Sequence, residues 1–312
     1  MAPPTTIDLP AIKARNWTLK TTYTVSQIIS YNLALGGSGS SLALVYESDP
    51  RFHALPTYGA VPCISIMSLV HAAMFDFLPN FQGHNHVHGE HYLSLKNAYP
   101  IPKGIETVNL ETTARVVDVV ARRTGVLVCV EIVTRDERTG IVICENEWAG
   151  FVMRTPSSGA NATQTPRGER TAVYPTPTRT PDRTITHQTT PEQAALYRAA
   201  SGDLNALHID PETAKAAGFK APILTGTCTL GIAVRHVLEA FASGDASRFK
   251  SVRVRLSGPV FAALGETVRT EMWQEDGERV LFKMIVDWER DERTVLSQGC
   301  VMLRGKNQGA SL

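Results

Sequence analysis

Three polar side chains of different chemical types lie within one short stretch of the second half of the sequence. Asp203, Asn205 and His208 supply a carboxylate, an amide and an imidazole within six residues, and Tyr197 and Arg198 precede them. A carboxylate and an imidazole held close together can take up and release protons, which is the chemistry of general acid–base catalysis. Asp and His at this spacing also occur in ordinary surface turns, so the spacing alone is weak evidence for a catalytic site.

The elements that must position this stretch occur twice along the chain. Residues 24–31 and 190–197 each predict an amphipathic helix that starts behind a capping Thr and reaches a Tyr. Each is followed by an irregular segment, a turn that contains Pro, and an apolar run compatible with a helix, at residues 63–77 and 227–241. Such an internal repeat indicates that one structural unit is present in two copies.

Each copy ends in extended segments rich in Val, Ile and Thr, separated by turn signals that contain Gly. The predicted strands are residues 108–120, 126–135, 141–152, 252–256, 267–273, 280–287 and 295–303. An apolar helix and an antiparallel sheet can each bury an apolar face only against the other. We therefore predict an α+β double hot-dog fold, in which each half is a sheet wrapped around a central helix.

The region between the two copies has a different composition. Residues 155–181 are dense in Thr, Pro and Ser and have almost no large apolar side chains, which is typical of a linker. The predicted organisation is a first hot-dog half at residues 1–154, a linker at 155–185 and a second half at 186–312.

Bulk composition limits the classes of function. The chain has 312 residues, with 31 Lys and Arg against 30 Asp and Glu, so it gives no reason to expect nucleic-acid binding. No stretch approaches the roughly 20 uninterrupted apolar residues of a membrane span, and the N-terminus lacks a signal-peptide pattern. Five scattered cysteines without a CxxC pair favour reduced thiols inside a cell. We expect a soluble protein that is peroxisomal or cytoplasmic; the terminal Ala310-Ser311-Leu312 resembles a peroxisomal address but lacks its basic residue.

The stretch that ends at His208 resembles a known motif. Type 2, R-specific enoyl-CoA hydratases of the MaoC-like family have a Tyr, a short spacer and the pattern Ser-Gly-Asp-x-Asn-Pro-Leu-His, which residues 197–208 follow closely. Residues 42–47, 55–59, 88–92 and 235–238 are similar to the hydratase part of peroxisomal multifunctional enzymes type 2. The resemblance covers nearly the whole chain except the linker and the two ends.

This resemblance implies an activity. In the family, water adds to a trans-2-enoyl-CoA to give a (3R)-hydroxyacyl-CoA, or leaves in the reverse dehydration, with the water held between an Asp and a His. The corresponding pair is Asp203 and His208, and the sequence leaves open which of them is the base. No metal or other cofactor is expected, because a carboxylate and an imidazole suffice for the proton transfers.

Other residues receive supporting roles. Asn205 is expected to orient the pair or the water, and the N–H of Gly226 to stabilise the enolate oxygen at the start of the second central helix. The resemblance also marks Glu47, Tyr197 and Arg198 as active-site residues or their neighbours. His88 and Gly89, in the similar segment 88–92, are expected to contact the substrate.

The sequence departs from the family pattern at two positions and between the two halves. Ala206 replaces a Pro, and Thr225 replaces the His that commonly precedes Gly226. When the two Tyr are aligned, Gly37 and Leu42 stand opposite Asp203 and His208, so the first half has no equivalent pair. We expect that half to hold the acyl chain, with space near the small residues 36–41.

Several alternatives stay open. Arg253 and Arg255 could bind the CoA phosphates or form the solvent face of a strand. His84, His86 and His88 occupy alternate positions, so on a strand they would share one face and could bind zinc. A polar strand edge is the simpler interpretation.

Two alternatives to the hydratase concern the whole protein. The second candidate enzyme is a MaoC-like dehydratase for a specialised-metabolite or polyketide-type thioester, and a non-catalytic acyl-CoA binder is a third interpretation. A homodimer is compatible with all three functions.

Overall fold

The computed structural model describes residues 4–37, 40–287 and 292–305. Each half of the chain supplies a set of strands. Those of the first half are β1 (Asn16–Tyr23), β2 (His86–Leu95), β3 (Val108–Arg122), β4 (Gly125–Asp136) and β5 (Val142–Met153). Those of the second half are β6 (Arg183–Gln188), β7 (Phe249–Leu256), β8 (Thr267–Gln274), β9 (Arg279–Asp287) and β10 (Arg293–Leu303).

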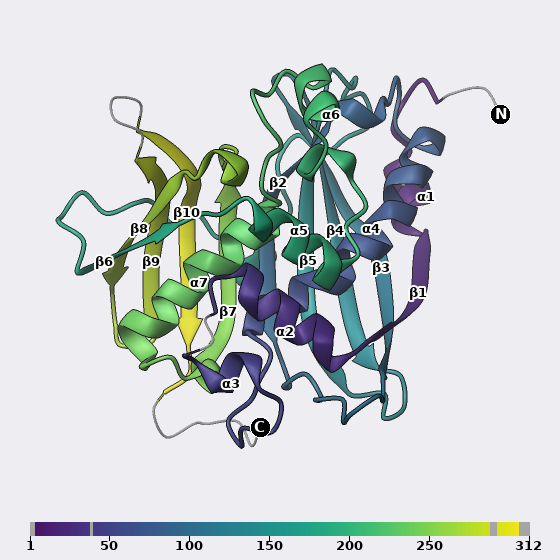
Figure 1. Ribbon diagram of the computed structural model, residues 1–312. Coiled ribbons are helices and arrows are strands. Elements are labelled where there is room, and N and C mark those ends of the chain that lie inside the picture. Colours follow the sequence, from purple (N-terminus) through teal and green to yellow (C-terminus); the bar gives the residue numbers. More distant parts are fainter. Residues whose placement is uncertain (1–3, 38–39, 288–291, 306–312) are drawn as a thin grey trace.

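All of these strands form one antiparallel sheet of ten strands (Figure 1). The strand order is β1-β3-β4-β5-β2-β7-β10-β9-β8-β6, so the two halves have the same internal order and are related by a pseudo-twofold axis. The halves join where β2 pairs with β7, with His91 opposite Val254 and Leu93 opposite Val252.

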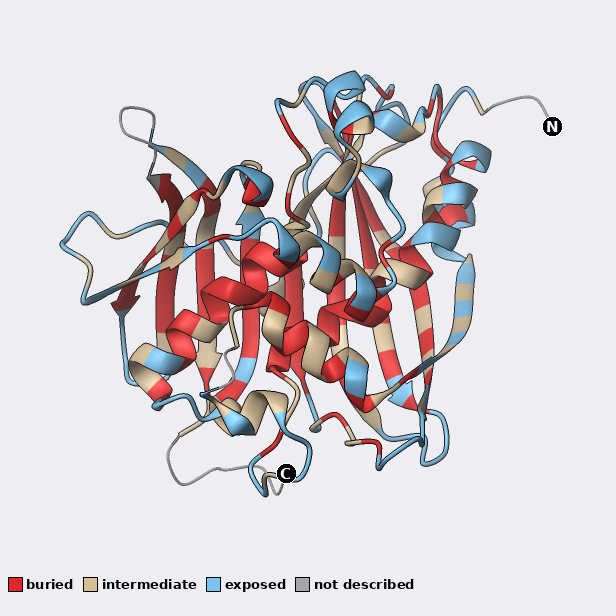
Figure 2. Cartoon of the chain, viewed as in Figure 1, coloured by how far each residue is buried: buried red, intermediate tan, exposed pale blue. Residues whose placement is uncertain are grey.

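The helices cover one face of this sheet. They are α1 (Leu9–Lys13), α2 (Val25–Ala34), α3 (Leu42–Val45), α4 (Val61–Ala73), α5 (Glu192–Ser201), α6 (Pro211–Ala216) and α7 (Gly226–Ala242). The two predicted central helices are α4 and α7, and most residues of α7 are buried against the second half of the sheet (Figure 2). The predicted double hot-dog fold is confirmed.

The repeated helices α2 and α5 pack side by side at the middle of the molecule (Figure 1). Their tyrosines meet: the rings of Tyr31 and Tyr197 are fully buried, with centroids 5.6 Å apart. Thr24 caps α2, as predicted, and it also forms a capping box with Gln27. At α5 the prediction was wrong in detail, because the N-cap position is Pro191 and no side chain caps the helix there.

Three strands were not predicted from the sequence. β1 and β6 are the two edge strands, and their side chains are mostly exposed or half-buried, so an apolar signal is weak in both. β2 begins with polar residues and is buried at its other end, since it lies between β5 and β7 in the middle of the sheet.

One helical segment, Pro56–Asp76, is long and apolar enough to cross a membrane by length and composition alone. It consists of α4 with a 3-10 turn at each end. Its buried residues, which include Ile66, Met67 and Val70, form a core with β3 and β4. That packing accounts for its apolar composition.

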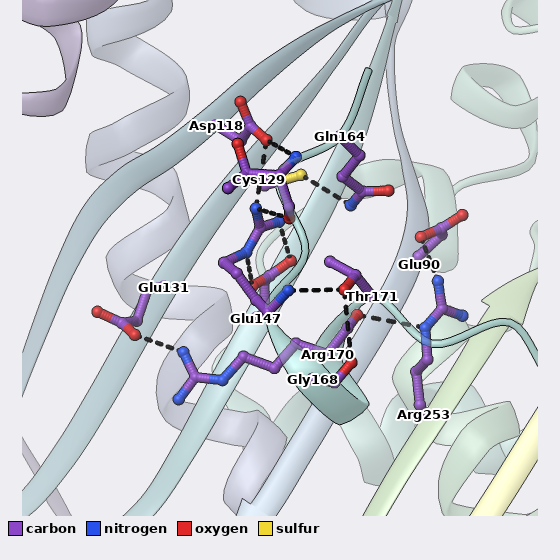
Figure 3. A network of polar contacts seen from close by, with 12 residues as sticks. Glu90, Asp118, Cys129, Glu131, Glu147, Gln164, Gly168, Arg170, Thr171 and Arg253 are labelled. Carbon is purple, nitrogen blue, oxygen red and sulfur yellow. Dashed lines mark hydrogen bonds and ion pairs between the residues drawn. The ribbon is translucent and has the colours of Figure 1, made fainter. Parts of the chain in front are cut away.

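The linker is held by ion pairs on the face of the sheet opposite the helices (Figure 3). Arg167 binds Glu147 at 2.7 Å and Asp118 at 3.2 Å, and these carboxylates are 3% and 0% exposed. Arg170 pairs with Glu131 and, at 2.8 Å, with Glu145. The linker, which was predicted to have no core of its own, is therefore held on the sheet by ion pairs.

Glu169 of the linker spans the junction between the halves. Its carboxylate accepts hydrogen bonds from Tyr92 on β2 at 3.2 Å and from Ser251 on β7 at 2.9 Å.

Burial would raise the pKa of Asp118, but hydrogen bonds from Thr165 and Asn161 and the charge of Arg167 outweigh it and hold that pKa below its usual value. A lowered carboxyl pKa contributes stability at neutral pH that is lost as the pH falls through it.

We predict that Arg167→Met lowers the free energy of unfolding by about 3 kcal/mol, because it leaves two buried carboxylates without their cation. Urea unfolding followed by circular dichroism measures the change. The matched control is Arg51→Met, which removes the ion pair between Asp49 and an Arg51 side chain that is 77% exposed. Because solvent screens this pair, the control should lower the free energy of unfolding much less. Equal effects in the two variants would contradict a structural role for the linker network.

Candidate active site

Asp203 follows the C-terminus of α5 directly. Gly202 adopts φ +67°, a left-handed conformation that favours glycine, and it ends the helix by donating its N–H to the carbonyl of Arg198. Arg198 in turn donates from its guanidinium to the backbone carbonyl of Asp203 at 2.7 Å. The turn leaves Asp203 only 9% exposed.

His208 faces Asp203 across a short gap. It ends a 3-10 turn, Ala206–His208, and its Nε2 lies 3.6 Å from Asp203 Oδ2. Its Nδ1 lies 2.8 Å from the carbonyl oxygen of Ile223, which can only accept a hydrogen bond. Nδ1 therefore carries the proton in the neutral ring, and Nε2 presents its lone pair to the gap.

Asn205 shapes the turn between the pair. Its backbone N–H donates to Asp203 Oδ1 at 3.0 Å, and its side-chain oxygen accepts from the N–H of Leu207 at 3.1 Å. The residue thus orients Asp203 through its main chain, while its side chain is exposed and caps the 3-10 turn. Orientation of the pair or of the water by the Asn205 side chain stays a prediction.

Thr225 and Gly226 begin α7 beside the pair. Thr225 is the N-cap residue, but its hydroxyl donates to Asp203 Oδ2 at 3.4 Å, and no side chain among the described residues caps this helix. The first amides of a helix have no acceptor within it and lie at the positive end of its dipole. A Cβ on Gly226 would lie 2.9 Å from a methyl carbon of Leu256, so the close packing there favours glycine.

Tyr197 forms a hydrogen bond with the first turn of α7, next to the site. Its hydroxyl donates to Thr227 at 2.7 Å, and burial holds the pKa of this phenol well above its usual range. It therefore connects α5 to the first turn of α7 as a neutral donor. Among the described residues its hydrogen bond is to Thr227, not to Asp203 or His208.

The first half has different residues at the equivalent place. Gly36 adopts φ +88°, and the N–H groups of Gly36 and Gly37 bond to the carbonyls of Leu33 and Asn32, which is a Schellman motif that ends α2. Leu42 is 48% exposed at the start of α3. The described part of segment 36–41 thus ends a helix; residues 38 and 39 lie outside the described residues, and acyl-chain binding there stays a prediction.

Three other predicted site residues lie apart from the pair. Glu47 is exposed in the turn after α3, an element separate from the loop that carries Asp203 and His208. His88 and Gly89 lie at a bulge of β2, where the ring of His88 stacks on Trp148 with centroids 3.4 Å apart. Substrate contacts of Glu47, His88 and Gly89 stay predictions.

The two arginines of β7 point away from the pair. Val252 and Val254 pack into the helix-side core, so Arg253 and Arg255, which alternate with them, lie on the linker side. Arg253 is 4% exposed and binds Glu90 at 2.6 Å (Figure 3). This position favours a structural role for Arg253 over binding of CoA phosphate, while Arg255 is exposed and its role stays a prediction.

The three alternating histidines, at positions 84, 86 and 88, have different surroundings. His84 lies in a 3-10 turn before β2, His86 stacks on His71 of α4, and His88 stacks on Trp148. Within residues 4–37, 40–287 and 292–305, no group of three or more His, Cys, Asp and Glu side chains could hold a metal ion.

Sequence reasoning missed the carbonyl of Ile223, because any residue could supply that atom. It also missed His91 and Trp148, which lie on neighbouring strands and have adjacent rings. Their contact follows from the pairing of β2 with β5, which no local pattern shows.

In comparisons with known proteins, each half of the chain matches a known domain family. Residues 172–295 match the MaoC like domain, and residues 21–154 match the MFE-2 hydratase 2 N-terminal domain. The pair of Asp203 and His208 lies in the first of these regions, and the half without a pair lies in the second.

Individual relatives agree with these matches. The chain is 36% identical over 265 residues to peroxisomal multifunctional enzyme type 2 of Drosophila melanogaster, with 83% of this chain covered. It spans less than half of that relative's length, 42%. It is 33% identical over 291 residues to the probable enoyl-CoA hydratase 2 of Dictyostelium discoideum, with 92% of this chain and 93% of that protein covered.

A solved structure is similar over nearly its whole length. The MaoC-like dehydratase of Phytophthora capsici superposes with a TM-score of 0.83 at 29% identity and covers 96% of this chain and 99% of that one. The chain belongs to the enoyl-CoA hydratase 2 family, and its MaoC-like second half carries the paired carboxylate and imidazole.

Proposed function

We propose that this protein is a hydro-lyase that adds water to a trans-2-enoyl-CoA to form a (3R)-hydroxyacyl-CoA, or catalyses the reverse dehydration. The observation that carries the proposal is the gap of 3.6 Å between Asp203 Oδ2 and His208 Nε2, the ring nitrogen that is left without a proton when the ring is neutral. The names of the relatives, which include enoyl-CoA hydratase 2, support it.

The gap is suited to a water molecule. A carboxylate oxygen and an imidazole lone pair both accept hydrogen bonds, so they repel a further acceptor and attract a molecule with two donors. Water can donate one hydrogen to Asp203 and the other to His208, which directs its own lone pair outward. That lone pair is the nucleophile that hydration at C3 requires.

The proton balance follows from this arrangement. As the C3–O bond forms, one member of the pair takes a proton from water, and the π electrons of the double bond move into the thioester as an enolate. A proton from the pair then forms the C2–H bond, so the pair ends the cycle in its starting protonation state. The proposed reaction needs no metal or redox cofactor for these steps.

The enolate oxygen requires a donor close to the pair. The amide groups of Gly226 and Thr227 lie in the uncapped first turn of α7, a helix of 17 residues. Such amides stabilise developing negative charge, and the helix dipole adds to their effect. We infer that the thioester oxygen binds at this turn, with the acyl chain directed toward the first half.

The names of several relatives also support a location. Proteins called peroxisomal multifunctional enzyme type 2 and peroxisomal enoyl-CoA hydratase 2 are among the similar sequences. We propose that this enzyme acts inside the cell, in peroxisomes. The terminal tripeptide 310–312, which resembles a peroxisomal address, lies outside the described residues.

We predict that Asp203→Asn and His208→Ala each lower kcat for trans-2-enoyl-CoA by about 10² to 10⁴, because each removes a group that transfers a proton in the transition state. Loss of absorbance of the enoyl thioester measures the rate. His84→Ala is the control for the histidine variant, since His84 is exposed and outside the site. Near-normal turnover in both site variants, with retained fold, would refute the assignment.

The hydroxyl of Thr225 has a testable role. We predict that Thr225→Val lowers kcat about three- to tenfold by removing one hydrogen bond to Asp203, whereas Thr225→Ser keeps the hydroxyl and stays within about twofold. Steady-state kinetics of the two variants measure the difference. If Ser and Val at this position give the same kcat, the contact between Thr225 and Asp203 has no part in the reaction.

The stereochemistry of the addition can also be predicted. Asp203 and His208 belong to one loop and hold water on one side of the substrate, so both the oxygen and the C2 proton should add to that face. We expect a (3R)-hydroxyacyl product formed by syn addition. Coupling to R- and S-specific 3-hydroxyacyl-CoA dehydrogenases identifies the product, and mainly (3S) product would contradict the proposed geometry.

A further inference from the structure

The helix side of the first half contains polar side chains that the proposed mechanism does not use. His91 on β2 is 1% exposed, and Asn146 on β5 is fully buried. His88 and Trp148, on the same two strands, are half-buried and border them. Trp148 packs against the apolar cluster around α4, while Leu93 and Cys144 on the same two strands belong to the cluster around α7.

The hydrogen bonds of His91 determine its tautomer. Asn146 donates its amide hydrogen to the carbonyl of Gly59 at 3.1 Å, so its side-chain oxygen faces His91 Nε2 at 3.1 Å as an acceptor. Nε2 must therefore carry the ring proton. Burial lowers the pKa of His91 to about 4, so the ring is neutral at physiological pH and Nδ1 is a lone pair. Among the described residues, this buried Nδ1 has no hydrogen-bond partner.

Trp148 presents the complementary group. Its indole N–H is buried and also has no partner in the described part of the chain. The ring is held in place by the stacked ring of His88, and its centroid lies 5.9 Å from that of His91. A buried donor and a buried acceptor without partners are each costly, and a hydroxyl group can both accept and donate a hydrogen bond.

The sheet places these rings close to the proposed thioester site. Leu256 on β7 contacts Gly226, and Val254, two residues earlier on the same face, pairs directly with His91. Two residues along a strand and one step to the next strand separate the Cα atoms of Leu256 and His91 by about 8 Å. An acyl chain that leaves the thioester at Gly226 toward the first half can reach His91 and Trp148.

We propose that His91 and Trp148 form a polar subsite for a hydroxyl group carried on the acyl chain of the thioester, beyond the reacting carbons. The proposal rests on the proposed hydratase function and specifies its substrate class. The hydroxyl oxygen accepts from the Trp148 indole N–H and donates to His91 Nδ1. A purely hydrocarbon chain leaves both groups unpaired and binds less well.

The test compares pairs of trans-2-enoyl-CoA substrates of equal length, with and without a hydroxyl that is moved one carbon at a time along the chain. For the wild-type enzyme we expect kcat/KM to be about tenfold higher for the hydroxylated member at the matching position. Trp148→Phe keeps an aromatic ring but removes the N–H, and should reduce that ratio to less than about threefold. Trp17→Phe is the control, because Trp17 lies on the edge strand β1, and it should keep the wild-type ratio.

Each outcome has a separate meaning. A wild-type ratio near one at every position would overturn the subsite and leave an ordinary buried water as the partner of these groups. A high ratio that Trp148→Phe leaves unchanged would also overturn it. If Trp148→Phe fails to fold, the wild-type ratio alone decides. Hydration of neither substrate would refute the proposed function itself.

Discussion

The antiparallel pairing of β2 with β7 is the interaction on which the rest of the structure depends. It joins two sheets of five strands into one, with the central helices α4 and α7 on one face and the linker on the other. The same pairing brings α2 against α5, where Tyr31 and Tyr197 meet across the pseudo-twofold axis. Backbone hydrogen bonds hold this junction. Its side chains can therefore pack with the helices on one face and bind the linker on the other.

The two halves use the same architecture in different ways. At the end of α5, a left-handed Gly202 turns the chain so that the next residue, Asp203, faces the start of α7. At the end of α2, a Schellman motif at Gly36 and Gly37 closes the helix and presents no ionisable side chain. A single proton-transfer pair in one half is compatible with the proposal that the other half holds the acyl chain.

Much of this organisation could be predicted from the sequence, and the failures have physical causes. The repeat, the central helices and the inner strands follow from apolar periodicity, and the neighbourhood of Asp203 and His208 follows from a short local motif. The edge strands β1 and β6 were missed because half or more of their side chains meet solvent. The role of the linker was missed because Arg167 and Arg170 find their carboxylates on strands about 20 to 50 residues away.

The chemistry of the site depends finally on atoms that have no sequence signature. The carbonyl of Ile223 decides which nitrogen of His208 is free, and hence whether the pair accepts two hydrogen bonds from water or accepts one and donates one. In the same manner the carbonyl of Gly59 orients Asn146, which orients His91 and leaves its second nitrogen as an acceptor. In both places a main-chain oxygen sets the tautomer of a histidine, and the tautomer sets what can bind. A motif can therefore identify the reacting residues, but only the folded main chain determines the direction of their hydrogen bonds, on which both water activation and substrate selection depend.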